Sequence, residues 1–107
     1  MSSAFVAVVK VADVAAGSAT TVVVAGREVA LFNIDGTFYA IENTCPHQGG
    51  PLAEGYIDGT TVTCPWHAWT FKLTDGKMTL GAFSFVYTYD VRIEGEWVTV
   101  SSEPRLP

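Results

Sequence analysis

The chain has few of the residues that carry chemistry, and few charges. It contains two cysteines and two histidines among 107 residues. Charged residues make up 16%, against about a quarter in a typical globular domain. Only 6 residues are basic and 11 are acidic, with no basic run, which leaves a net charge of −5. This balance argues against nucleic acid or an anionic membrane as partner, and it favours docking to basic patches on other proteins.

Long apolar runs and targeting segments are also lacking. No run approaches the roughly 18 apolar residues that predict a membrane span. The opening stretch MSSAFVAVVKVADV has no basic start, and Lys10 and Asp13 interrupt its apolar residues. A Gly-x-Gly-x-x-Gly fingerprint for NAD or FAD is missing as well. We therefore expect a cytoplasmic protein with reduced thiols, no membrane association and no nucleotide cofactor of the Rossmann type.

What is present is a set of short segments rich in Val, Ile, Phe and Tyr, separated by glycine turns. Such segments are typical of an all-β domain, and 49% hydrophobic content supports a single folded unit over 1–107. Alternation in 69–73 would bury Trp69, Phe71 and Leu73, and 101–107 should be a frayed tail. We expect strands at 4–9, 19–25, 28–34, 37–42, 56–57, 60–63, 69–73, 86–93 and 96–100.

Every cysteine and histidine falls within one short interval. Cys45 and His47 form a Cys-x-His group, and Cys64 and His67 form a Cys-x-x-His group after a gap of sixteen residues. Thiolate and imidazole together suit zinc or iron–sulfur chemistry. Three interpretations compete: buried core cysteines with satisfied histidines, a structural zinc site, or a 2Fe–2S centre. Zinc sites usually group like ligands, whereas a centre with two cysteines on one iron and two histidines on the other needs mixed groups.

The residues around these groups resemble a known family. CPHQGGPL and CPWHAWTF are similar to the two boxes of Rieske 2Fe–2S proteins, and DGTFYAIENTCPH, EGYIDGTTVTC and YDVRIEGEWVTV are similar to the family's approach strand, linking hairpin and closing hairpin. The resemblance implies an antiparallel β-sandwich with a small cluster-binding β subdomain at about 43–73. It also implies one Rieske 2Fe–2S cluster, with Cys45 and Cys64 on the buried iron and His47 and His67 on the outer iron.

The sequence departs from the family pattern in three places. Ala68 stands where glycine is common, and LGAF (Leu80–Phe83) lacks the proline of many third loops. Neither box has a second cysteine, so the disulfide of respiratory Rieske proteins cannot form, and the resemblance is to the soluble ferredoxin type. Trp69 and Phe71 stand where high-potential relatives carry Ser and Tyr, which predicts a reduction potential at the low end.

These features imply a carrier rather than an enzyme. Oxygenase subunits with a Rieske centre also need a mononuclear iron held by two further histidines and a carboxylate, and no histidine is left here. The resemblance implies that electrons pass from an NAD(P)H-dependent flavin reductase to the terminal oxygenase of an aromatic-ring oxygenase system. The alternatives are the Rieske small subunit of an NAD(P)H nitrite reductase and a zinc-stabilised binding module without a redox role.

Overall fold

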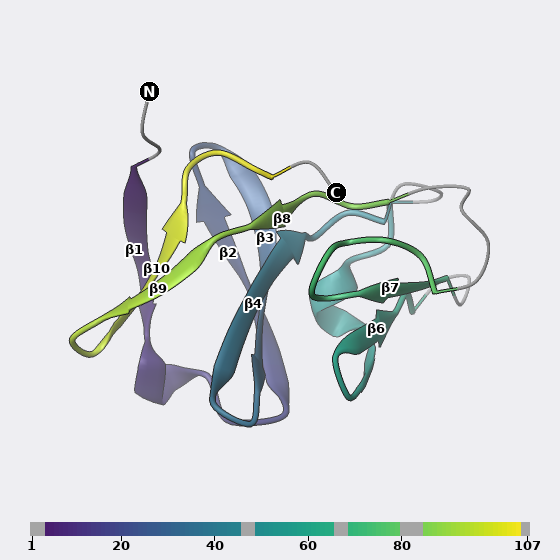
Figure 1. Ribbon diagram of the computed structural model, residues 1–107, viewed down its shortest axis with the longest axis horizontal. Helices are drawn as coiled ribbons and strands as arrows, with labels where there is room; N and C mark the ends of the chain where they lie inside the picture. Colours follow the sequence, from purple (N-terminus) through teal and green to yellow (C-terminus); the bar gives the residue numbers. More distant parts are fainter. Residues whose placement is uncertain (1–3, 46–48, 66–68, 80–84, 106–107) are drawn as a thin grey trace.

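The computed structural model describes residues 4–45, 49–65, 69–79 and 85–105, whose strands form three antiparallel sheets (Figure 1). This architecture confirms the all-β antiparallel prediction. The outer sheet has the order β1 (Phe5–Lys10), β10 (Trp97–Ser101), β9 (Val91–Glu94). The middle sheet has the order β2 (Ser18–Val24), β3 (Arg27–Ile34), β4 (Thr37–Glu42), β8 (Thr88–Tyr89). The small sheet has the order β5 (Tyr56–Asp58), β6 (Thr61–Thr63), β7 (Thr70–Lys72). Two short 3₁₀ turns, η1 (Val11–Asp13) and η2 (Leu52–Glu54), lie between strands.

The middle sheet is buried on both faces. Successive side chains of a strand point to opposite faces, and on β3 Val29 and Leu31 enter one core while Ala30 and Phe32 enter another. The outer core consists of Val14, Val22, Val24, Val29, Leu31, Ala40, Tyr89, Val98 and Val100. The small-sheet core consists of Ala30, Phe32, Ile41, Cys45, Leu52, Val62, Cys64, Phe71, Leu73 and Val86. The middle sheet therefore packs against the outer sheet on one face and the small sheet on the other.

The hairpin between β3 and β4 turns where the sequence indicates. Asp35 and Gly36 both have positive φ, 53° and 90°. Two consecutive positive φ angles are typical of the tight hairpin turn whose twist matches that of the flanking strands, and the Asp-Gly pair adopts them readily. This turn sets the register of β3 on β4, which leads directly to the first cysteine.

The prediction of one strand over 86–93 is wrong. The chain forms β8, which pairs with β4, and then β9, which pairs with β10, with Asp90 between them. The alternation of apolar and polar residues in the sequence continues across this break, but the strand with which the chain pairs changes from β4 to β10. Val86 lies in the small-sheet core and Tyr89 in the outer core. Asp90 marks the crossing from middle to outer sheet, and its carbonyl accepts a hydrogen bond from the Ser101 amide (2.9 Å).

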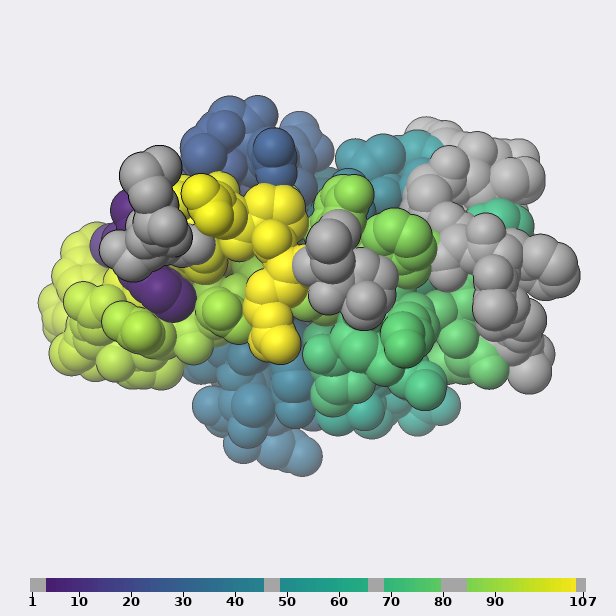
Figure 2. Space-filling view, turned by 45° about the horizontal axis from the view of Figure 1, so that its top comes forward, coloured from purple at the N-terminus to yellow at the C-terminus, as the bar shows by residue number. Residues whose placement is uncertain are grey.

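The prediction of a frayed tail over 101–107 is also wrong as far as Arg105. The Ser102 amide donates to the Ala4 carbonyl, and the Arg105 amide donates to the Thr88 carbonyl, each at 2.7 Å. The Arg105 guanidinium lies 3.1 Å from the Asp90 carboxylate. Figure 2 shows the yellow C-terminal residues lying across the front of the molecule. The backbone bonds are the main restraint, because an exposed ion pair contributes little.

Within the described ranges, no helix has the length and apolar character needed to span a membrane.

Gly76 joins the small sheet to the segment that returns to the middle sheet. Its φ is +78°, and an added Cβ would overlap the carbonyl oxygen of Val86 and lie 3.3 Å from a methyl of Thr88. The Gly76 carbonyl also accepts a hydrogen bond from the Val86 amide (2.8 Å). The two backbones thus approach as closely as they do because position 76 has no side chain.

We predict that Gly76→Ala lowers the free energy of unfolding by about 2–4 kcal/mol, combining left-handed backbone strain with overpacking. Gly36→Ala is the matched control, since Gly36 has φ +90° and open space around its Cβ position. It should cost about 1–2 kcal/mol, from backbone strain alone. Urea unfolding of both variants measures the difference. Equal losses would show that the contact with Val86 adds nothing.

Candidate metal centre

The first loop carries Cys45 directly after β4. The Cys45 amide donates to the Gly50 carbonyl (2.9 Å), and the Gly49 amide donates to the Cys45 carbonyl (2.8 Å). Thr44 and Pro51 face each other across an isolated bridge at the base of the loop. Gly49 has φ +75°, a backbone conformation that glycine adopts without steric cost, and it allows the loop to turn tightly. These bonds hold Cys45 at the inner side of a short closed loop.

The second loop carries Cys64 between β6 and β7. The Cys64 amide donates to the Trp69 carbonyl (2.8 Å). At the base of the loop, the hydroxyls of Thr63 and Thr70 form a cross-strand hydrogen bond of 2.9 Å. The hairpin of β6 and β7 thus presents Cys64 at its end.

The two loops close in the same way. In each, the cysteine amide donates to the carbonyl five residues ahead, Gly50 for Cys45 and Trp69 for Cys64. The predicted ligands His47 and His67 fall inside these loops and lie outside the described residues, as do Ala68 and the Leu80–Phe83 segment. The structure therefore describes the cysteine half of the predicted four-residue site.

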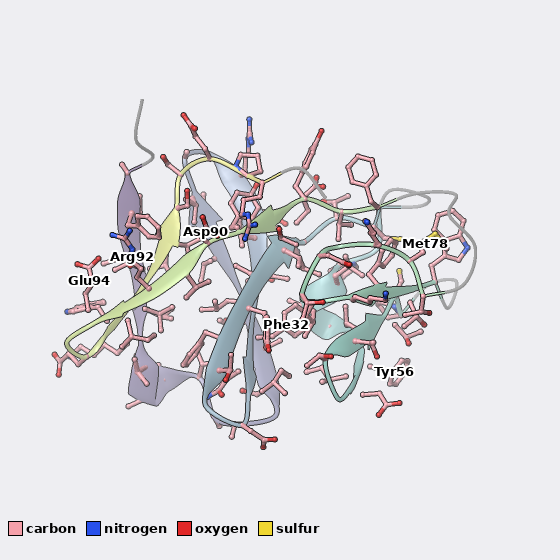
Figure 3. All side chains as sticks on the ribbon, viewed as in Figure 1. Phe32, Tyr56, Met78, Asp90, Arg92 and Glu94 are labelled. Carbon is pink, nitrogen blue, oxygen red and sulfur yellow. The ribbon has the colours of Figure 1, made fainter. Side chains whose placement is uncertain are left out.

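Both thiols reach the same buried region. Cys45 and Cys64 are each 1% exposed and belong to the small-sheet core. Both are thiols rather than halves of a disulfide. In Figure 3 the yellow sulfur atoms gather near Met78, at the end of the molecule that carries β6 and β7. Two soft thiol ligands, delivered to one apolar wall by two loops of equal closure, fit an iron–sulfur group or zinc.

The segment after the second loop follows the predicted alternation in part. Phe71 and Leu73 are buried in the small-sheet core, as expected, whereas Trp69 is only half-buried. Trp69 precedes β7 and still belongs to the loop, where its carbonyl accepts the hydrogen bond from the Cys64 amide. It therefore does not follow the alternation of the strand. Phe71, on β7, shares the core with both thiols.

Gly55 sets the approach of one loop to the other, and the sequence interpretation missed it. It follows η2, and an added Cβ would overlap the carbonyl oxygen of Thr63 and lie 2.9 Å from a methyl of Val62 and 3.2 Å from the Leu52 carbonyl oxygen. The residues leaving the first loop therefore press against the strand entering the second. A signal was present, since glycine is a common residue where the backbone must approach another group closely.

Comparison with known proteins places the chain in a family. The sequence-family model of the Rieske [2Fe-2S] domain matches residues 4–84 of this chain. The chain is 44% identical to the ferredoxin subunit of 3-phenylpropionate/cinnamic acid dioxygenase from Shigella boydii, over 91% of this chain and 92% of the relative. It is 32% identical to the ferredoxin component of the naphthalene 1,2-dioxygenase system from Pseudomonas putida, over 88% of this chain and 91% of the relative.

Solved structures share the fold over nearly the whole chain. The ferredoxin of carbazole 1,9a-dioxygenase from Nocardioides aromaticivorans superposes with a TM-score of 0.88 at 29% identity, covering 94% of this chain and all of that one. A complex of reduced oxygenase and oxidized ferredoxin of carbazole 1,9a-dioxygenase gives 0.88 at 26%, covering 99% and 100%. A protein named as a nitrite reductase NADPH small subunit gives 0.81 at 24%, covering 91% and 97%, a likeness of fold alone. With two cysteine loops of matched closure on this fold, the chain belongs to the Rieske [2Fe-2S] family.

Proposed function

We propose that this protein is a one-electron carrier with a Rieske 2Fe–2S cluster, passing electrons from an NAD(P)H-dependent flavin reductase to the terminal oxygenase of an aromatic-ring oxygenase system. The observation that carries the proposal is that two buried thiols lie in one core. They come from two loops that are closed by hydrogen bonds of the same kind. The names of relatives at 44% and 32% identity support the ferredoxin role.

The proposed ligands are Cys45, His47, Cys64 and His67, and the proposed cluster-binding subdomain is 43–73 within a single domain. When bound, the cluster stores one electron reversibly. The burial of both cysteines supports their assignment to the inner iron, because solvent does not reach that side. The histidines would then hold the outer iron, the one nearer a docked partner.

The residues around the site hold it still. Each loop is closed at its base by a hydrogen bond, and the lack of a side chain at Gly55 lets the two loops approach each other closely. An electron carrier gains from such rigidity, because ligands that are already placed need little rearrangement when the charge changes. The chain thus supplies placement and water exclusion, and we propose no catalytic residue.

The partners follow from the relatives and from charge. A ferredoxin similar to this chain is known in complex with its oxygenase, and a net charge of −5 suits a basic docking surface on a partner. The proposal includes a cytoplasmic location, where thiols stay reduced. A nitrite reductase small subunit remains the alternative, supported by fold alone.

We predict two irons and two acid-labile sulfides per chain, with an EPR signal that appears only on reduction. Metal and sulfide analysis of protein expressed with ample iron checks this. Stoichiometric zinc without sulfide would instead establish the zinc-stabilised module. Cys64→Ser should lose iron, sulfide and visible absorbance, because the remaining ligands cannot complete the site. Thr63→Ser is the matched control: it keeps the hydroxyl that pairs with Thr70 and should keep the cluster.

We predict that the reduced protein is reoxidised rapidly by the oxygenase component of an aromatic-ring dioxygenase and only slowly by a nitrite reductase large subunit. Stopped-flow absorbance follows the reaction, and Cys64→Ser protein gives the background. Rapid reoxidation by the nitrite reductase subunit alone would reverse the assignment of partner.

We predict a reduction potential in the low part of the Rieske range of roughly −150 to +300 mV. Phe71→Tyr should raise it by about 40–60 mV if the hydroxyl donates to a cluster sulfur, the equivalent of one hydrogen bond of about 1–1.4 kcal/mol. Phe32→Tyr, which changes another fully buried phenylalanine of the same core on β3, is the control. Protein-film voltammetry measures all three proteins. Equal shifts in both variants would mean that core polarity, not a specific donor, sets the potential.

A further inference from the structure

Asn43 occupies the neck of the first loop, two residues before Cys45. Its side chain is buried, with 3% of the residue exposed. The side-chain Oδ1 accepts from the Ala53 amide (2.9 Å), and Nδ2 donates to a carboxylate oxygen of Glu28 (3.2 Å). Both halves of the carboxamide are thus used, one toward η2 and one toward β3.

The chemistry of the partners fixes which way the amide points. A backbone N–H can only donate and an ionised carboxylate can only accept, so oxygen must face Ala53 and nitrogen must face Glu28. A flipped amide would set oxygen against carboxylate and NH₂ against N–H. The side chain therefore has one satisfied orientation in this pocket.

The backbone of Asn43 ties the same elements together. Its amide donates to the Glu28 carbonyl (3.2 Å), and its carbonyl accepts from the Leu52 amide (2.6 Å). The entrance of the first loop at Asn43, its exit at Leu52 and the start of β3 at Glu28 are thereby joined at one residue. Because Leu52 is buried in the small-sheet core, this joint also anchors the loop to the wall that holds both thiols.

We propose that Asn43 is a positioning residue for the cluster: its carboxamide, oriented by Glu28, holds the first loop so that Cys45 faces the metal. The inference rests on the proposed function, since it assigns a role toward the cluster. Ordinary loop packing needs only a side chain of the right size at 43. A positioning role needs a donor on one side and an acceptor on the other.

Isosteric substitutions test that distinction. Asn43→Asp keeps the size and the acceptor toward Ala53 but sets a carboxylate against Glu28. Pairing it with Glu28→Gln restores a donor–acceptor contact with the donor now on residue 28, and the double variant has the net charge of the wild type. Glu28→Gln alone leaves Asn43 an amide oxygen to donate to, and Glu28→Ala removes the acceptor without placing a charge in the neck.

The test measures the rate at which visible absorbance is lost under a chelator. It also measures the EPR spectrum of the reduced protein and the reduction potential of the cluster. Asn43→Asp should lose its cluster about tenfold faster than the wild type and show an altered EPR spectrum, because the donor–acceptor contact between buried Asn43 and exposed Glu28 has become a repulsive one. The double variant and Glu28→Gln should return close to the wild-type rate and spectrum. Glu28→Ala should fall between them, and it keeps the test available if Asn43→Asp does not fold.

Asn33→Asp is the matched control for a buried asparagine away from the loops. Asn33 is 6% exposed, and it too uses both halves of its amide, donating to the Val14 carbonyl (2.7 Å) and accepting from the Gly36 amide (2.8 Å). Its substitution should lower global stability without changing the cluster-loss rate of the folded protein or its EPR spectrum.

The outcomes separate the two proposals. Wild-type protein without iron and sulfide would overturn the proposed function. A wild-type cluster with unchanged loss rates and spectra in folded Asn43→Asp and Glu28→Ala would overturn only the positioning role. Failure of the double variant to recover would likewise overturn it, as would an equal effect of Asn33→Asp on cluster loss.

Discussion

Burial of β3 on both faces is the constraint on which the molecule depends. Val29 and Leu31 pack toward the outer sheet, while Ala30 and Phe32 pack toward the small sheet that carries the cysteine loops. Because protein interiors are close-packed, a volume change on one face shifts the strand against the other core. The loops are therefore supported from behind by a sheet that is itself packed on both faces, which is why two short loops can hold two thiols in fixed places.

The backbone bonds of the loops also restrict how the cysteines can tune a bound cluster. The amides of Cys45 and Cys64 are both engaged by carbonyls, Gly50 and Trp69. They are therefore committed to closing the loops, and donors to the sulfurs have to come from other amides or side chains. The cysteine amides thus serve as loop closures, and the tuning of the potential of the proposed cluster falls to their neighbours.

Much of this arrangement was predictable from sequence because it is local. The Asp35-Gly36 turn and the alternating strands follow from backbone preference and burial, and the cysteine groups follow from spacing. The wrong prediction at Asp90 and the unpredicted contact of Asn43 both arose where partners are distant in sequence. The break at Asp90 depends on which sheet each half of a uniform pattern joins, and the Asn43 carboxamide depends on Glu28, fifteen residues away. Nothing in a local pattern reveals such pairings.

The pairing of β1 with β10 has a consequence for how the protein is made. Phe5 lies opposite Ser101, so the first strand must wait for the last one to leave the ribosome. Cys45, Cys64 and their loops emerge well before that moment, when the face of β3 bearing Val29 and Leu31 is still uncovered by β10. Biosynthesis thus presents the two cysteine loops first and completes their supporting layer afterwards, so the nascent chain passes through a stage in which both thiols have been made before the fold has closed.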